Sequence, residues 1–185
     1  MTTQGELNKQ ARALASTLRE RQLKVVFAES CTGGLVSASL TRIPGISEYL
    51  CGSAVVYRVG TKAEWLNISS DILHKPGPVS RVVAVEMAKE VLDRTPEADL
   101  AASITGHLGP DAPQRLDGLV YVAVVSGRRL GGGQLQTVVK RQQLASPQSR
   151  QTARAASLRP QRQMAAAALV LSTTRSVLEK TRISR

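Results

Sequence analysis

Two adjacent nucleophilic side chains, Ser30 and Cys31, lie in a short turn that contains two glycines. Residues 28–34 read Ala-Glu-Ser-Cys-Thr-Gly-Gly, between an apolar, β-prone run at 24–27 and a helix-like run at 35–40. A turn from a strand into a helix is where an α/β protein usually binds its ligand. The turn therefore predicts a ligand site with a nucleophile in it. An ordinary turn capped by Thr32 is the alternative, and the turn alone does not decide between them.

A serine attacks an acyl group only when another group takes its proton, so a base has to be found elsewhere in the chain. His74 lies in a proline-rich loop and is expected to be exposed, while His107 lies in a second glycine-containing loop and is a candidate substrate contact. Cys31 is the rival nucleophile, since a helix N-terminus lowers the pKa of a thiol. Because Ser30 and Cys31 are adjacent, we expect only one of them to face the site.

Lys62 is the other candidate base, because burial can lower the pKa of a lysine until its neutral amine is available. It follows Tyr57 by five residues, just after a β-prone run at 53–57. If this strand ends beside the Ser30 turn, Lys62 and Tyr57 reach one cleft. On spacing alone, a surface Lys62 and a packed Tyr57 are the simpler interpretation.

Acyl transfer also requires hydrogen-bond donors for the developing oxyanion. The backbone N–H groups of Thr32, Gly33 and Gly34 are candidates, and Thr105 and Gly106 are expected to line the opposite wall. The two cysteines and two histidines show no metal-ligand spacing, so no metal site is predicted.

The hydrophobic pattern predicts a single α/β domain over residues 1–185, with three layers (α/β/α) and a mixed sheet. The expected helices are 6–22, 32–42, 61–66, 82–92 and 161–180, and the expected strands are 24–28, 53–57, 98–104, 119–125 and 134–140. The run at 119–125 is continuously apolar, which is typical of an inner strand, and it forms a hairpin with 134–140. Residues 71–78 and 143–160 are expected to be loops, and Ser80 is expected to cap the helix that follows it.

The net charge of +11 lies entirely in the last third of the chain. Residues 1–127 carry 13 basic and 13 acidic side chains, whereas residues 128–185 carry 12 basic side chains and one acidic one. This basic segment has no interleaved aromatic residues for stacking bases, so a solvated basic face is favoured over a nucleic-acid partner. No apolar run is long enough to span a bilayer and the first twenty residues lack a signal core, so we expect a cytoplasmic protein without a membrane partner.

The ordered set of motifs resembles the C-terminal domain of the competence-damage-inducible CinA family, which includes stand-alone nicotinamide-nucleotide amidases. The resemblance covers residues 5–140 in order and residues 162–169 more weakly. The matching positions are residues 28–34, Pro44-Gly45, Tyr57, Lys62, Val79-Ser80, Thr105-Gly106, Gly109-Pro110 and residues 118–121.

The resemblance implies hydrolysis of the carboxamide of nicotinamide mononucleotide to nicotinate mononucleotide and ammonia. By this analogy Ser30 attacks the amide carbon, Lys62 relays the proton and Tyr57 positions or assists it. The implied substrate-binding residues lie in the two glycine loops: Cys31, Thr32, Gly33, Gly34, Thr105, Gly106 and His107. The resemblance implies no cofactor, and it implies a homodimer or larger homo-oligomer.

This chain departs from the family pattern in three places. Val59 stands where a polar residue is usual, His107 and Leu108 interrupt the second loop, and the Gly-Asp-Arg element before the last helix is not recognisable. Arg154 and Arg159 are candidate substitutes for the arginine of that element. Two alternatives stay open: a catalytically inactive homologue that keeps the pocket and binds a nucleotide or acts as an interaction protein, and a nucleic-acid-associated protein acting through residues 128–185.

Overall fold

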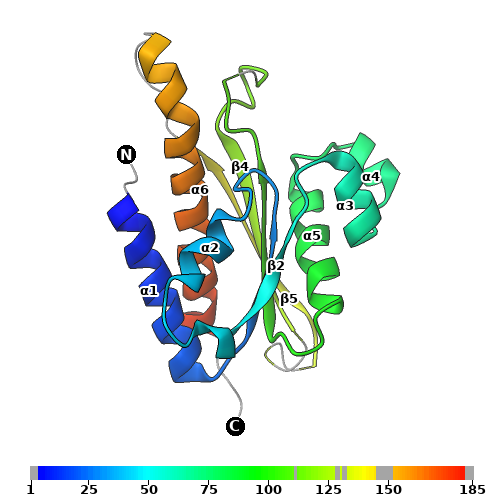
Figure 1. The fold of residues 1–185 in the computed structure, drawn as a ribbon. Coiled ribbons are helices and arrows are strands. Elements are labelled where there is room, and N and C mark those ends of the chain that lie inside the picture. The colour runs from blue at the N-terminus through cyan, green and yellow to red at the C-terminus, as the bar shows by residue number, and fades with distance from the viewer. Residues whose placement is uncertain (1–3, 111, 128–129, 131–132, 145–151, 182–185) are drawn as a thin grey trace.

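The computed structural model describes residues 4–110, 112–127, 130, 133–144 and 152–181 (Figure 1). Its elements follow one another as α1 (Gln4–Arg21), β1 (Val25–Glu29), α2 (Leu35–Thr41), a 3-10 turn (Ile46–Glu48), β2 (Leu50–Val55), α3 (Val59–Leu66), α4 (Ser70–His74), α5 (Arg81–Asp93), β3 (Leu100–Gly106), β4 (Leu119–Ser126), β5 (Gln136–Gln143) and α6 (Thr152–Lys180).

The described strands form a five-stranded mixed sheet in the order β2-β1-β3-β4-β5. β1 is parallel to both β2 and β3, whereas β4 is antiparallel to β3 and to β5. This confirms the predicted mixed sheet, the inner position of residues 119–125 and the hairpin. Because β1, β2 and β3 are parallel, the residues that follow them meet at one edge of the sheet.

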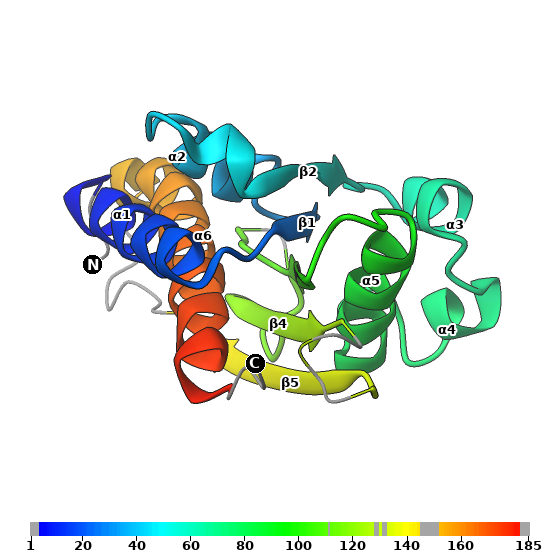
Figure 2. The same cartoon turned by 90° about the horizontal axis from the view of Figure 1, so that it is seen from below.

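Helices cover both faces of the sheet (Figures 1 and 2). Along β1, alternate side chains point to opposite faces. Val25 and Phe27 pack with residues of α1, α2 and α6, while Val26 and Ala28 pack with residues of α5 and α3. The result is the predicted α/β/α domain, whose buried core is almost entirely aliphatic.

Two segments predicted to be loops contain helix. Residues 71–78 overlap α4, whose first turn is capped by the Ser69 hydroxyl. Within 143–160, α6 already begins at Thr152 and continues through Pro160, and residues 145–151 lie outside the described part of the chain. A proline removes one N–H from the helix, and the surrounding alanines and leucine have high helix propensity.

Two elements beside the nucleophile have boundaries that differ from the predicted ones. α2 begins at Leu35 rather than at 32, because Gly33 and Gly34 adopt positive φ angles of 61° and 96°. β2 ends at Val55, so Tyr57 follows the strand instead of closing it. Ser80 caps α5 as predicted, accepting a hydrogen bond from the Val83 N–H.

Candidate active site

Ser30 directly follows β1, in a turn that is held by the buried carboxylate of Glu29. This carboxylate accepts hydrogen bonds from the Thr32 and Ser53 hydroxyls and from the backbone N–H groups of Gly34, Val36 and Ser37. The three N–H groups belong to the first turn of α2 or precede it, where a helix has unpaired donors and favours negative charge. Glu29 therefore fixes the nucleophile turn. Sequence reasoning missed this role, although an acidic residue just before a helix is a usable signal.

Lys62 lies beside Ser30 inside the protein. Its Nζ donates hydrogen bonds to Ser30 Oγ at 2.8 Å and to the Val56 carbonyl oxygen at 3.0 Å. Only 2% of Lys62 is exposed, and this burial lowers the pKa of its amine to about 8. The neutral amine needed for a base is thus accessible near physiological pH, and the surface position favoured by spacing alone is wrong.

Cys31 is buried on the same turn, with 4% of its surface exposed. Burial raises the pKa of its thiol to about 12, because the thiolate would lose its hydration. The thiol is therefore protonated at neutral pH. This environment makes Ser30 the better nucleophile of the adjacent pair.

A cavity of about 330 Å³ opens onto Ser30 and Lys62. Its walls come from five segments: the Ser30 turn, the segment around Tyr57 and Lys62, the residues before α5, the second glycine loop and α6. The lining residues are Ser30, Cys31, Tyr57, Val59, Lys62, Pro78, Val79, Thr105, Gly106, His107, Leu108, Gly109, Ala112 and Arg159. The volume lies in the usual range for small-molecule sites. The structure thus brings Thr105, Gly106 and His107 to the cavity that contains Ser30, while His74 is exposed elsewhere.

A larger cavity of about 760 Å³ lies between β5 and the C-terminal half of α6. It includes Ser126, which pairs with Leu100 at the opposite end of β3 from Thr105. Among the described residues, no hydroxyl of this cavity is hydrogen-bonded to a lysine. The chemistry therefore favours the smaller cavity as the candidate active site.

Two of the predicted oxyanion donors have hydrogen-bond partners within the turn itself. Thr32, Gly33 and Gly34 do not line the cavity. The Gly33 N–H donates to the Ser30 carbonyl oxygen at 3.1 Å, and the Gly34 N–H donates to Glu29. These two donors stabilise the turn itself, because the start of α2 needs partners for its own backbone.

Tyr57 reaches the cavity from the segment after β2, with 54% of its surface exposed. Its hydroxyl accepts a hydrogen bond of 2.7 Å from Arg159, whose guanidinium also donates to the Gly109 carbonyl oxygen at 2.6 Å. The tyrosine hydroxyl is thus bonded to α6 rather than to Lys62 or Ser30. Arg159 lies in the stretch predicted to be a loop.

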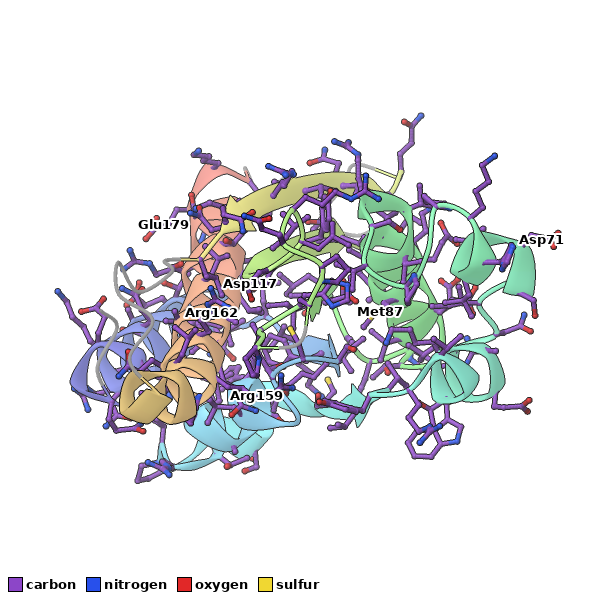
Figure 3. All side chains as sticks on the ribbon, turned by 90° about the horizontal axis from the view of Figure 1, so that it is seen from above. Asp71, Met87, Asp117, Arg159, Arg162 and Glu179 are labelled. Atoms are coloured by element: carbon purple, nitrogen blue, oxygen red, sulfur yellow. The ribbon has the colours of Figure 1, made fainter. Side chains whose placement is uncertain are left out.

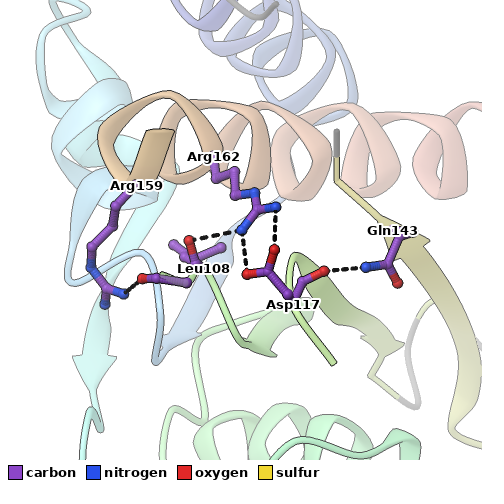
Figure 4. A network of polar contacts seen from close by, with 6 residues as sticks. Leu108, Asp117, Gln143, Arg159 and Arg162 are labelled. Carbon is purple, nitrogen blue, oxygen red and sulfur yellow. Dashed lines mark hydrogen bonds and ion pairs between the residues drawn. The ribbon is translucent and has the colours of Figure 1, made fainter. Parts of the chain in front are cut away.

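α6 also holds the second glycine loop through Arg162 (Figures 3 and 4). Arg162 is 2% exposed and forms two hydrogen bonds, of 2.6 and 2.8 Å, with the Asp117 carboxylate. Its guanidinium also donates to the Leu108 carbonyl oxygen at 3.2 Å. One turn of helix thereby fixes the segment that carries His107, Leu108 and Gly109 into the cavity wall.

Comparison with known proteins identifies the family. The model of the CinA C-terminal domain matches residues 7–169. This chain belongs to the CinA C-terminal domain family.

A CinA-like protein of Syntrophotalea carbinolica is 38% identical over 132 residues, which are 66% of this chain and 32% of that protein. A putative competence-damage inducible protein of Desulforudis audaxviator is 42% identical over 119 residues, 63% of this chain and 29% of that protein. The chain thus matches about a third of the length of these relatives.

Solved structures of CinA proteins share the fold. The competence/damage inducible protein CihA of Agrobacterium tumefaciens has a TM-score of 0.81 at 25% identity, covering 97% of this chain and 99% of that one. The competence damage-inducible protein A of Klebsiella pneumoniae has a TM-score of 0.79 at 22% identity, covering 95% and 99%. The single-domain CinA-like architecture predicted from the motifs is therefore confirmed.

The departures from the CinA pattern gather around the cavity. Val59 and His107 both line it, and Arg159 reaches it from α6. Among the described residues, no group of histidine, cysteine or acidic side chains is arranged to hold a metal ion. None of the helices described is long and apolar enough to cross a membrane.

Proposed function

We propose that this chain is an amidohydrolase in which Ser30 is the nucleophile and Lys62 the general base. The observation that carries the proposal is the 2.8 Å contact between Lys62 Nζ and Ser30 Oγ in a buried position beside a cavity. A nucleophile hydrogen-bonded to a base, which is itself oriented by a third group, is the arrangement that covalent catalysis requires. The Val56 carbonyl oxygen is the orienting group here.

The reaction runs in two halves. Neutral Lys62 accepts the Ser30 proton while Ser30 Oγ attacks the amide carbon, and the resulting ammonium then protonates the departing nitrogen so that ammonia leaves. A water molecule then attacks the acyl ester while Lys62 takes its proton. Lys62 returns this proton to Ser30 Oγ as the bond between Oγ and the acyl carbon breaks, which releases the carboxylic acid and restores Ser30. Tyr57 at the cavity mouth positions the substrate or assists the proton transfer.

The substrate we propose is nicotinamide mononucleotide, with nicotinate mononucleotide and ammonia as products. Its support is the family resemblance, together with a cavity whose volume of about 330 Å³ suits a compact nucleotide. The reaction uses only protein side chains and water, so no cofactor is required.

Purified protein supplied with nicotinamide mononucleotide tests the proposal through ammonia release and chromatography of the product. The native chain and Ser16→Ala, a control on an exposed serine of α1, are expected to turn over equally. Ser30→Ala is expected to lose about 10³-fold or more in kcat. Absence of release by folded native protein from about pH 6 to pH 10, or release that survives Ser30→Ala, overturns the proposal.

A second candidate is a pocket that binds the nucleotide without hydrolysing it. Its support is Val59 at the cavity, where the family usually has a polar residue, together with the engagement of the Tyr57 hydroxyl by Arg159. This candidate predicts thermal stabilisation by nicotinamide mononucleotide with no ammonia released. Any turnover that depends on Ser30 eliminates it.

A further inference from the structure

The cavity beside Ser30 is lined by two basic side chains. The described residues that line it include Lys62 and Arg159 but no aspartate or glutamate. Lys62 is buried next to the nucleophile, whereas Arg159 is exposed at the cavity. A lining of this kind favours a ligand that carries negative charge at a distance from its reacting group.

Arg159 differs from Arg162, its neighbour one turn along α6. Arg162 is buried and its charge is compensated by Asp117. Arg159 donates only to neutral acceptors among the described residues, the Tyr57 hydroxyl and the Gly109 carbonyl oxygen. A guanidinium has five N–H donors, so these two bonds orient Arg159 and leave both its charge and further donors available to a ligand.

Arg159 connects α6 to two other parts of the cavity wall. It crosses from α6 to Tyr57, a partner 102 residues earlier in the chain, and to the glycine loop that forms the facing wall. Its charge also acts on the thiol of Cys31, the residue next to Ser30. A ligand bound through Arg159 would therefore place its remaining atoms beside the nucleophile turn.

We infer that Arg159 is a specificity-determining residue that binds an anionic group, a phosphate monoester or a carboxylate, on the amide substrate. The inference rests on the proposed function for the identity of the reacting amide. The planar fork of a guanidinium matches the two oxygens of such an anion, and charge-assisted hydrogen bonds of this type are the strong ones.

Binding measured without turnover tests Arg159 separately from catalysis. In the Ser30→Ala background, calorimetry compares nicotinamide mononucleotide with nicotinamide riboside, which lacks the phosphate. We expect the nucleotide to bind about tenfold or more tightly than the riboside, and Arg159→Gln to reduce this ratio to about threefold or less. Arg58→Gln is the matched control, since this exposed arginine follows Tyr57 directly but does not line the cavity.

Inorganic phosphate and acetate provide a second measurement on the otherwise native chain. One or both are expected to raise the Tm, with the effect lost in Arg159→Gln and kept in Arg58→Gln. Phosphate acting alone identifies a phosphate monoester as the preferred group, and acetate acting alone identifies a carboxylate. If the nucleotide binds through Arg159 but is never hydrolysed, the proposed function fails and this inference stands.

The inference is overturned if Arg159→Gln leaves the nucleotide-to-riboside ratio unchanged and neither phosphate nor acetate has an effect on the Tm that depends on Arg159. If ammonia release is observed together with that result, the proposed function stands and this inference alone is removed.

Discussion

Lys62 Nζ lies 2.8 Å from Ser30 Oγ although the two residues come from different elements, α3 and the turn after β1. The contact forms because β1 and β2 are parallel neighbours, so the segments after them leave the same edge of the sheet. The Val56 N–H donates to the Glu29 carbonyl oxygen at 2.8 Å and fastens these two segments together. The candidate base is therefore held by the sheet rather than by a flexible loop.

The rate of hydrolysis is expected to rise with pH through the pKa of Lys62. Burial lowers this pKa to about 8, so the neutral amine is the minor form at pH 7 and the major form at pH 9. Between these values kcat/KM should increase about tenfold. A pH profile on nicotinamide mononucleotide measures this, with Lys62→Arg as an inactive control at every pH. A flat profile from pH 7 to 9 would contradict Lys62 as the base.

Replacing Lys62 with methionine is expected to change how the free energy of unfolding depends on pH. The folded pKa is near 8 and the ordinary value is 10.5, so the unfolded chain binds more protons between these two pH values. The free energy of unfolding of the native chain should thus rise with pH across this window, by up to about 3 kcal/mol relative to Lys62→Met. Urea denaturation at pH 7 and at about pH 10 measures the difference. If the native chain and Lys62→Met differ by the same free energy of unfolding at both pH values, folding does not lower the pKa of Lys62.

Cys31 is expected to be dispensable for catalysis. Its buried thiol has a pKa raised to about 12, so it supplies almost no thiolate at neutral pH. Cys31→Ala should keep kcat within about threefold of the native value, and iodoacetamide should inactivate the protein only slowly. Rapid inactivation that Cys31→Ala prevents would instead make Cys31 the nucleophile.

Glu29→Ala is expected to destabilise the fold and abolish activity together. The substitution leaves three backbone N–H groups around the start of α2 without their carboxylate acceptor. A loss of about 3 kcal/mol or more in the free energy of unfolding follows. Glu64→Ala, at an exposed position on α3, is the control and should change stability by less than about 0.5 kcal/mol. If Glu29→Ala keeps the native free energy of unfolding, the fold does not need the hydrogen bonds that the Glu29 carboxylate accepts.

Asp117→Ala is expected to cost more than removal of the acidic partner of an exposed arginine. It leaves the Arg162 guanidinium, which is 2% exposed, without this carboxylate, at a cost of about 3 kcal/mol. Glu90→Ala removes the partner of Arg94, whose side chain is 42% exposed, and should cost less than about 1 kcal/mol. Because the Asp117 pair fixes the second glycine loop, Asp117→Ala should also raise KM. Equal losses of unfolding free energy in the two variants would contradict a special role for the ion pair between Asp117 and the buried Arg162.

The elements of the fold and the candidate nucleophile could be predicted from the sequence, because both depend on local patterns. A continuous apolar run marked β4, and the small residues of the Ser30 turn marked the end of β1. The pairing of Lys62 with Ser30 depends on which strands are neighbours, and spacing along the chain does not contain that information. Before the structure, the pair followed from the family resemblance, and from spacing only on the condition that the strand at 53–57 ends beside the Ser30 turn.

The contribution of α6 to the site could not be derived in the same way. Arg159 meets Tyr57 across 102 residues, and Arg162 meets Asp117 across 45. Pro160 between these two arginines suggested a loop, because a proline usually ends a helix. The role of Glu29 was missed although an acidic residue just before a helix is a usable signal, because its partners Ser53 and Ser37 lie on different elements.

α6 gives the candidate site a fixed order of assembly during synthesis. Ser30 and Lys62 leave the ribosome early, with β1 and β2, whereas Arg159 and Arg162 are among the last parts of the fold to emerge. Until α6 has been made, the Arg162 contacts with Asp117 and Leu108 that hold the second glycine loop cannot form. The cavity wall is thus completed only after α6 packs against the sheet.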